Sequence, residues 1–322
     1  MLKCDDEVIL KAMIHAAIDL GTNAIRLIVA EELSDRKIRI LHRNRLVVRL
    51  GEGFAGGKRI QPESLQRAVK AVKEFSSEAA RFGAQKVILV GTSVWREAEN
   101  RESARQSLHR ETGLLVQIIS GEAEAKLTSY GVTQTLGLSP KNLAIADIGG
   151  GSSECIFFPV HGKPSFSSIP LGAVWLTEKY LLHDPPTACE WEQMTEFCRS
   201  TIEESIPPVC TDSQTHFVGT GGTATTLATI EQGQRSYDPD RINNSVIPLA
   251  SLEELADHLR SMPVRARGKI RGLEKGREDI ILAGAAIMVT LMKTLRVARL
   301  RLSDAGLPEG IIWHEISPNP YL

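Results

Sequence analysis

The stretch AIDLGTNAIRL, residues 17–27, carries Asp19 near the end of an apolar run and then turns through glycine, threonine and asparagine into a second apolar run. Glycine and asparagine in a short link between two apolar runs are typical of a β-hairpin. The pattern predicts strands over residues 16–20 and 25–31, with the aspartate at the end of the first. A third strand is expected over residues 37–45.

A second stretch, ADIGGGSSECIF at residues 146–157, repeats this plan. An apolar strand again delivers an aspartate, Asp147, directly before a turn of small residues. Glycines let backbone amides approach an oxyanion closely, and hydroxyl side chains add donors. Two such turns facing each other would hold a phosphate chain, and their recurrence indicates an internal duplication. The phosphate-binding residues expected in the two turns are Gly21, Thr22, Asn23, Gly149, Gly150, Gly151, Ser152 and Ser153.

Helices and strands alternate along the rest of the chain, which predicts an α/β fold. Apolar residues at helical spacing indicate a helix over residues 62–82, and Thr92 with Ser93 are expected to cap a helix that runs on through Arg101. Glycines join a strand to a helix near residues 217–226. The other expected elements are strands over residues 86–90, 116–119, 143–147 and 155–160 and a helix from about residue 121.

At 322 residues the chain is long enough for two domains, each with its own core. Its 42% of hydrophobic and 24% of charged residues are typical of a globular protein rather than a disordered or fibrous one. The cysteines are odd in number and show no zinc-binding spacing. Buried, reduced thiols are therefore expected at Cys4, Cys155, Cys189, Cys198 and Cys210.

The longest uncharged apolar run, residues 280–292, is too short to span a bilayer and predicts a core helix. Acidic residues precede any apolar stretch at the N-terminus, which is unlike a secretory signal. We therefore expect a cytoplasmic protein with no membrane partner. The tryptophans are expected in the core rather than as platforms for stacked bases, and no nucleic-acid partner is expected.

Net charge is only −1, but residues 260–301 hold eleven Lys/Arg against three Asp/Glu, an excess of eight positive charges that leaves the remainder near −9. Such a run is either a solvated face or an anion-binding surface, and charge alone does not separate the two. A strip of cations would suit a long polyanion. The strip comprises Arg265, Arg267, Lys269, Arg271, Lys275 and Arg277.

Five motifs in order resemble those of the exopolyphosphatase/guanosine pentaphosphate phosphatase (Ppx/GppA) family, over nearly the whole chain. They are AIDLGTN with Arg26 and Leu27, GTS at 91–93 with Arg96, ISG at 119–121, DIGGGSSE at 147–154, and SDAGLPEG at 303–310. The resemblance implies two duplicated actin-like ATPase (ribonuclease H-like) domains with an interdomain cleft. It divides the chain into domain I, residues 14–130 plus 303–322, and domain II, residues 131–302, as in the short, two-domain members.

The same resemblance assigns site residues. Matching residues 119–125 to the family pattern ISGxEEA implies a catalytic glutamate at Glu124, although Ala123 stands where the family usually has the first glutamate. Glu154 and Asp147 are expected to be catalytic together with Glu124; Glu154 is implied to position water or metal, and Arg26 to contact phosphate oxygens. Either Arg271 or Arg277 is implied to contact substrate in the basic strip.

Asp19 and Asp147 reach the same expected site from two strands, and opposed aspartates of this kind orient a hydrated Mg²⁺ (or Mn²⁺). Glu154 joins them as a third expected metal-site carboxylate. A further loop, with Gly219, Gly221, Gly222 and Thr223, resembles a nucleotide-binding segment.

The sequence thus predicts a phosphoanhydride hydrolase, an exopolyphosphatase that releases orthophosphate from inorganic polyphosphate by attack of a water activated by Glu124. The close alternative is a guanosine pentaphosphate (pppGpp) 5′-phosphohydrolase, since both substrates present a terminal phosphoanhydride. More distant alternatives are an ATP-binding actin-like module or sugar kinase, and a non-catalytic polyphosphate sensor. A homodimer is retained as a candidate assembly.

Overall fold

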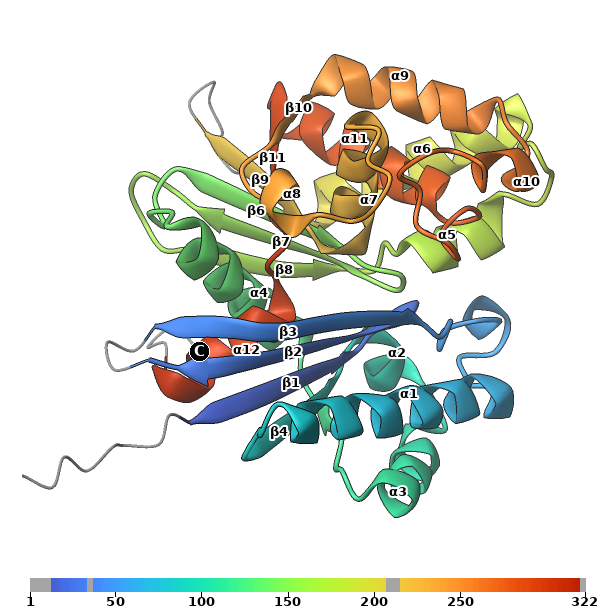
Figure 1. Ribbon diagram of the computed structural model, residues 1–322. Coiled ribbons are helices and arrows are strands. Elements are labelled where there is room, and N and C mark those ends of the chain that lie inside the picture. Colours follow the sequence, from blue (N-terminus) through green and yellow to red (C-terminus); the bar gives the residue numbers. More distant parts are fainter. Residues whose placement is uncertain (1–12, 34–36, 207–214, 319–322) are drawn as a thin grey trace, which may run out of the picture.

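A computed structural model describes residues 13–33, 37–206 and 215–318. Two mixed β-sheets lie one above the other, each covered by helices on its outer side (Figure 1). The first has the strand order β3-β2-β1-β4-β5 and the second the order β10-β11-β9-β6-β7-β8. This is the α/β fold with two sheets that the duplicated hairpins predict.

The first sheet contains β1 (Ile14–Leu20), β2 (Ala24–Glu32), β3 (Ile38–Val47), β4 (Lys86–Gly91) and β5 (Gln117–Ile118). β1 pairs antiparallel with β2 and parallel with β4. Its outer face packs against α1 (Pro62–Arg81), whose apolar stripe is buried and which begins with a proline, as helices often do. The link after β3 contains the short 3₁₀ helix η1 (Phe54–Gly56).

One helix prediction in this half is wrong. The helix expected to run through Arg101 is two helices, α2 (Ser93–Glu97) and α3 (Arg101–Thr112). Thr92 precedes α2, but its side chain makes no capping hydrogen bond. Thr92 and Ser93 line a pocket between the sheets instead.

The second sheet repeats the pattern of the first. β6 (Leu143–Ile148) pairs antiparallel with β7 (Ser153–Phe158) and parallel with β9 (His216–Thr220), as β1 does with β2 and β4. The remaining strands are β8 (Ser165–Ile169), β10 (Val246–Pro248) and β11 (Arg299–Leu302). Its helices are α5 (Ala173–Tyr180), α6 (Ala188–Ser205), α7 (Gly221–Glu231), α8 (Pro239–Ile242), α9 (Leu249–Arg260), α10 (Val264–Arg267) and α11 (Ile281–Thr294).

Two helices lie between the sheets: α4 (Gly121–Leu136) and α12 (Leu307–Ile316) (Figure 1). They cross closely, because a Cβ at Gly310 would lie 1.8 Å from the carbonyl oxygen of Leu127. From α4, Leu127 packs with the first sheet and Val132 with the second. Although α12 follows the last strand of the second sheet, it packs on β1 and β2 of the first. The domain limits expected from the sequence stay a prediction.

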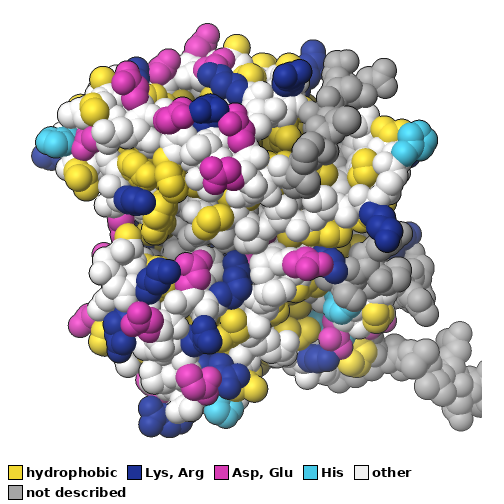
Figure 2. Space-filling model, turned by 180° about the vertical axis from the view of Figure 1, so that it is seen from behind, with side chains coloured by type: hydrophobic (Ala, Val, Ile, Leu, Met, Phe, Trp, Pro, Cys, Tyr) yellow, Lys and Arg dark blue, Asp and Glu magenta, His cyan; other side chains and the backbone are white. Residues whose placement is uncertain are grey.

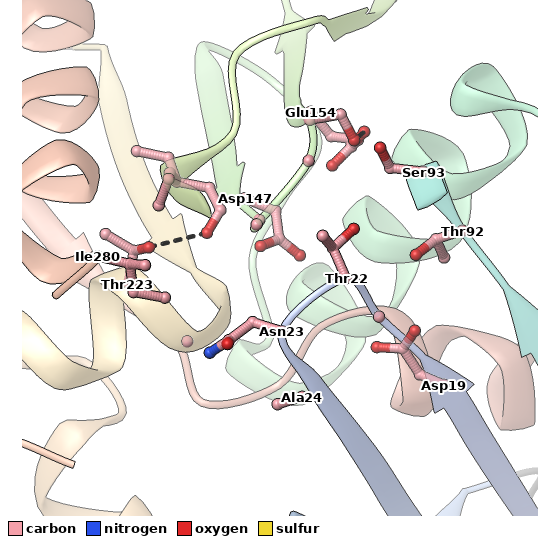
Figure 3. Close-up of a pocket in the computed structure, with 18 of the residues that line it drawn as sticks. Asp19, Thr22, Asn23, Ala24, Thr92, Ser93, Asp147, Glu154, Thr223 and Ile280 are labelled. Atoms are coloured by element: carbon pink, nitrogen blue, oxygen red, sulfur yellow. Dashed lines mark hydrogen bonds between the residues drawn. The ribbon is translucent and has the colours of Figure 1, made fainter. Parts of the chain in front are cut away.

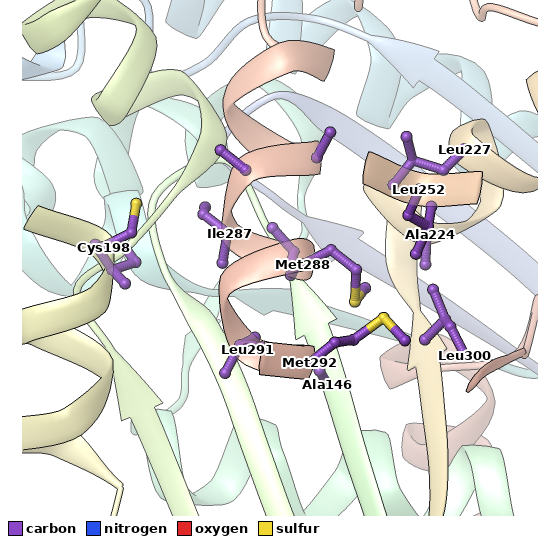
Figure 4. Packing of buried hydrophobic residues seen from close by; sticks show 14 of the residues in the cluster. Ala146, Cys198, Ala224, Leu227, Leu252, Ile287, Met288, Leu291, Met292 and Leu300 are labelled. Atoms are coloured by element: carbon purple, nitrogen blue, oxygen red, sulfur yellow. The ribbon is translucent and has the colours of Figure 1, made fainter. Parts of the chain in front are cut away.

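The apolar run at residues 280–292 forms most of α11, and its core position is confirmed. Figure 4 shows Ile287, Met288, Leu291 and Met292 of this helix among side chains from neighbouring strands and helices. In the described part of the chain, no helix combines the length and the apolar character needed to cross a membrane.

The cysteine prediction holds in part. Cys155 and Cys198 are buried free thiols, and burial raises the pKa of Cys198 to about 12. Cys189 is exposed near the start of α6, so the prediction is wrong there. Cys4 and Cys210 lie outside the described residues.

Candidate active site

The two hairpin turns meet between the sheets. Figure 3 shows Asp19, Asp147 and Glu154 gathered around the turn that carries Thr22. A Cβ on Gly151 would lie 2.9 Å from Oγ1 of Thr22 and 2.4 Å from Oγ of Ser93. The second turn therefore lies against the first turn and the start of α2, and the two turns line one pocket of about 60 Å³.

Glycine at equivalent positions shapes both turns. A Cβ on Gly21 would lie 2.7 Å from the carbonyl oxygen of Ala24, and a Cβ on Gly149 would lie 2.9 Å from that of Ser152. Real Cβ atoms do not approach a carbonyl oxygen this closely, so both turns need a residue without a side chain. The prediction of two tight hairpin turns from these glycines is therefore confirmed.

Asp19 and Asp147 differ in what stands opposite them on the neighbouring strand. Asp19 is paired in register with Arg26, and Nη2 of Arg26 lies 3.1 Å from its Oδ2. Asp147 is paired in register with Glu154. Burial raises the pKa of both aspartates, and at Asp147 the nearby cations Arg26 and Arg277 act in the other direction.

Glu124 reaches the pocket from the first turn of α4, where Ser120 caps the helix by accepting a hydrogen bond from the backbone NH of Ala123. Its carboxylate accepts a hydrogen bond from Arg96 and is largely buried. Burial raises the pKa of Glu124 to about 7, against the opposing effect of Arg96. A carboxyl with a pKa near neutrality is suited to accept a proton from water.

Arg96 connects Glu124 to the second hairpin. Its Nη2 donates to Oγ of Ser152 at 3.3 Å and lies 3.9 Å from Oε1 of Glu154. Glu154 also accepts hydrogen bonds from Ser152 at 2.9 Å and Ser168 at 2.8 Å. Burial and the neighbouring carboxylate of Glu124 raise the pKa of Glu154 well above its usual range.

Arg277 closes the pocket on the side of α7. A Cβ on Gly222 would lie 2.0 Å from its Nη2, so the guanidinium lies directly against the start of this helix. Burial lowers the pKa of Arg277, while Glu274 beside it opposes this shift. The guanidinium and the helix N-terminus both favour an anion in the space between them.

Most of the predicted site residues come together. Those that line the pocket are Asp19, Gly21, Thr22, Asn23, Arg26, Glu124, Asp147, Gly149, Gly150, Gly151, Ser152, Glu154, Gly222, Thr223 and Arg277. Ser153 does not, because its hydroxyl donates to the carbonyl oxygen of Leu171 at 2.6 Å. Arg271 is exposed and lies outside the pocket as well.

The predicted nucleotide-type loop serves both the core and the pocket, because Gly219 packs inside while Gly222 and Thr223 also line the pocket. Gly219 is close to Leu300 and Met288 in the core, and Gly221 leaves room for the carboxylate of Asp147. Gly222 lies under Arg277, and Thr223 donates to the carbonyl oxygen of Ile148 at 3.0 Å.

Arg96 is the site residue that sequence reasoning undervalued, because an arginine on a short helix is ordinarily solvated. The signal was its place in the GTS motif, since Thr92 and Ser93 line the pocket one helical turn earlier. The basic strip is not a continuous exposed surface. Arg267 is buried, and its Nε donates to the carbonyl oxygen of Leu259. On the face shown in Figure 2, basic and acidic side chains are intermixed.

The chain is similar to known proteins over nearly its whole length. It is 31% identical to exopolyphosphatase 2 of Mycobacterium tuberculosis, over 92% of this chain and 96% of the relative. A solved Ppx/GppA family member of Aquifex aeolicus is 30% identical, with a TM-score of 0.78 over 95% of this chain and 98% of that one. An exopolyphosphatase structure from Cytophaga hutchinsonii is 23% identical and shares the fold, with a TM-score of 0.85 over 96% and 99%.

The sequence model of the Ppx/GppA phosphatase family matches residues 28–318. This range begins within β2, after the first turn, and contains the second hairpin together with Arg96, Glu124 and Arg277. The fold is the actin-like ATPase type expected from the resemblance. The chain therefore belongs to the Ppx/GppA phosphatase family and is a phosphoanhydride hydrolase.

Proposed function

We propose that the protein is an exopolyphosphatase, which releases orthophosphate from the ends of inorganic polyphosphate. One observation carries the proposal: the turns of Asp19 and Asp147, from opposite sheets, line one pocket with Glu124. The similarity to a mycobacterial exopolyphosphatase supports the choice of polyphosphate as substrate. The pocket offers backbone amides, hydroxyls and arginines, which are the donors that terminal phosphate oxygens require.

In this proposal Glu124 takes the proton of the attacking water. The water oxygen forms a bond to the terminal phosphorus while the bond from phosphorus to the bridging oxygen breaks. Orthophosphate leaves, and the shortened chain keeps the bridging oxygen with its negative charge. The pKa of about 7 at Glu124 leaves a substantial fraction ionised at neutral pH and able to accept the proton.

Arg26 and Arg277 are the cations that would stabilise the charge that develops on phosphate. Both line the pocket, Arg26 from the strand after the first turn and Arg277 against the start of α7. Fixed donors of this kind need no reorganisation during the reaction. Arg96 would orient Glu124 and Glu154 rather than bind substrate, because its hydrogen bonds go to protein groups.

The proposal includes a Mg²⁺ or Mn²⁺ ion held by Asp19, Asp147 and Glu154 through water. No group of three or more His, Cys, Asp or Glu among the described residues is arranged to hold a metal directly. Mg²⁺ usually keeps several waters and takes only one or two carboxylates plus substrate oxygens, so these residues suit it. Oδ1 of Asp19 is buried and has no hydrogen-bond partner, which also fits a cation or its water. When bound, the ion would neutralise phosphate charge.

Guanosine pentaphosphate is the second candidate substrate. A cavity of about 300 Å³ shares Arg26 with the catalytic pocket and is also lined by Tyr237, Arg45 and Asp304. An aromatic ring with donors and acceptors around it suits a nucleobase. In this second candidate function, the nucleoside would lie in this cavity, next to the phosphate pocket.

Phosphate release from long-chain polyphosphate, guanosine pentaphosphate and ATP, measured side by side with Mg²⁺ or Mn²⁺, tests the proposal. We expect the highest kcat/KM for polyphosphate. A higher value for guanosine pentaphosphate would favour the second candidate, and a higher value for ATP would favour an ATP-binding module. Binding of polyphosphate without any release would indicate a sensor.

A further inference from the structure

Arg277 does not stand alone in the pocket wall. Its Nε donates to Oε2 of Glu274, and the other oxygen of that carboxylate, Oε1, lies 2.8 Å from Nε of Arg45. Arg45 belongs to β3 of the first sheet, whereas Glu274 and Arg277 lie in the segment between α10 and α11 that covers the second. One carboxylate therefore joins arginines from the two halves of the molecule.

The charges explain why this carboxylate matters. The pKa values of Arg45 and Arg277 are lowered mainly by burial. The charge of Arg26 lowers both further, and the charge of Arg45 also lowers the pKa of Arg277. Glu274 opposes both shifts. Without it, the buried guanidinium of Arg277 and the half-buried guanidinium of Arg45 would repel each other across the boundary between the two halves.

The backbone holds Glu274 in place on both sides. Gly272 and Gly276 have φ angles of +89° and +87°, which favour glycine. A Cβ on Gly272 would lie 2.2 Å from the carbonyl oxygen of Thr229 in α7, and one on Gly276 would lie 3.0 Å from Cγ1 of Val47 in β3. The segment is thus pressed between α7 and the edge of the first sheet.

Arg277 lines the pocket, and its Nη atoms lie against Gly222 at the start of α7. No hydrogen bond joins its Nη1 or Nη2 to any other described residue, while its Nε is taken by Glu274. A guanidinium held at Nε presents both Nη atoms as a fork, the arrangement that binds two phosphate oxygens.

From this geometry we propose that Glu274 is a positioning residue for phosphate binding. It fixes the fork of Arg277 toward the pocket and couples it, through Arg45, to contact between the two halves of the molecule. Arg277 is then correctly aimed only while the first sheet lies against the segment at residues 272–280. The inference deepens the proposed function, since it concerns how the same pocket holds a terminal phosphate.

The test compares Glu274→Gln, Arg45→Met and the double variant with wild type. We expect each single change to raise KM about tenfold while kcat stays within about twofold. The double variant should be no worse than Glu274→Gln alone, because the two residues act through one contact. Glu274→Asp, which keeps the charge, should recover part of the loss. An unchanged KM in Glu274→Gln would overturn the inference.

Arg49→Met is the matched control. Arg49 lies two residues after β3 and pairs with Asp279 at 2.7 Å, so it also joins the first half of the molecule to this segment. Among the described residues, its side-chain hydrogen bonds go to Asp279 and Gly276 and not to Arg277. We expect its KM to stay within about twofold of wild type. An equal rise in KM for Arg49→Met and Glu274→Gln would show that loosening any contact between the two halves has the same effect. That result would overturn the specific role of Glu274.

Direct binding separates this inference from the choice of substrate. Titration of tripolyphosphate into proteins that also carry Glu124→Gln should show about tenfold weaker affinity when Glu274→Gln is added. Failure of the wild-type enzyme to hydrolyse polyphosphate would refute the proposed function, yet this titration would still report on Glu274. Equal affinity with and without Glu274→Gln would overturn the inference whatever the substrate.

Discussion

The two hairpins pair their strands in the same way, but the residue opposite the aspartate carries a positive charge in the first and an acidic group in the second. In the first, Asp19 stands in register with Arg26, while at the equivalent position of the second, Asp147 stands in register with Glu154. One oxygen of the first aspartate is therefore paired with a cation in its own sheet, and that arginine also lines the phosphate pocket. The second hairpin gathers two carboxylates, whose pKa values burial raises. The duplicated hairpins thus differ in one residue opposite the aspartate: the first adds an arginine for phosphate, and the second adds a further carboxylate for water or a cation.

The largest expected effect concerns Glu124, the carboxylate that α4 brings to the pocket between the two hairpins. Glu124→Gln should lower kcat by about 100-fold or more, because it removes the group that accepts the proton and leaves the shape intact. Binding of polyphosphate should remain, since no phosphate contact is lost. Rapid-mixing phosphate assays and equilibrium titration measure the two quantities. Normal turnover would contradict the role assigned to this residue.

Exchanging the cation of the first hairpin should have the next largest effect. Arg26→Met leaves Asp19 buried without its partner, and we expect a loss of roughly 3 kcal/mol in the free energy of unfolding and a rise in KM. Urea denaturation and steady-state kinetics test both. Adding Asp19→Asn should restore much of the stability but not the KM. Recovery of both by the double variant would show that Arg26 serves the fold alone.

The pH dependence of activity should separate the role of Glu124 from that of Arg26. Glu124 must be ionised to act, and its pKa of about 7 lies above the ordinary value of 4.5. Activity should therefore rise with pH up to about 7 and fall roughly tenfold for each unit below it. The same shift favours the protonated carboxyl in the folded state, so its contribution to stability is present below about pH 4.5 and is lost as pH rises through 7.

A pH–rate profile of kcat/KM measures this rise in activity below pH 7. The small residual activity of Glu124→Gln should lack it, whereas Arg26→Met should retain it, because the arginine does not titrate in this range. A wild-type profile that is flat between pH 5 and 8 would argue against a carboxyl base.

The smallest effect is expected at Arg271. This side chain is exposed and outside the pocket, while Arg277 is buried in its wall. Arg271→Gln should change KM for short chains by no more than about twofold, and Arg277→Gln should raise it about tenfold. A stronger effect of Arg271→Gln on long chains, lost in high salt, would show that part of the basic strip guides the polymer.

Much of the fold could be read from the sequence because its signals are local. Strand, turn and strand at residues 14–32 and 143–158 follow from apolar runs and from turn glycines. In each turn, any larger residue would bring its Cβ too close to a carbonyl oxygen. The spacing of seven residues from Asp19 to Arg26 and from Asp147 to Glu154 also places each pair in register. Exposure of Cys189 and burial of Arg267 were not predictable, since both depend on packing between distant segments.

The sequence by itself therefore determined two aspartate hairpins, an α/β chain between them and a glutamate at the start of a helix. Only the tertiary structure decided that Arg96 holds Glu124 and that Arg277, rather than Arg271, enters the pocket. It also decided that Glu274 joins Arg45 to Arg277 across more than two hundred residues of sequence. The reason is physical: hydrogen bonds within a turn follow from neighbouring residues, but the burial and pairing of a charge depend on which sheet folds against it.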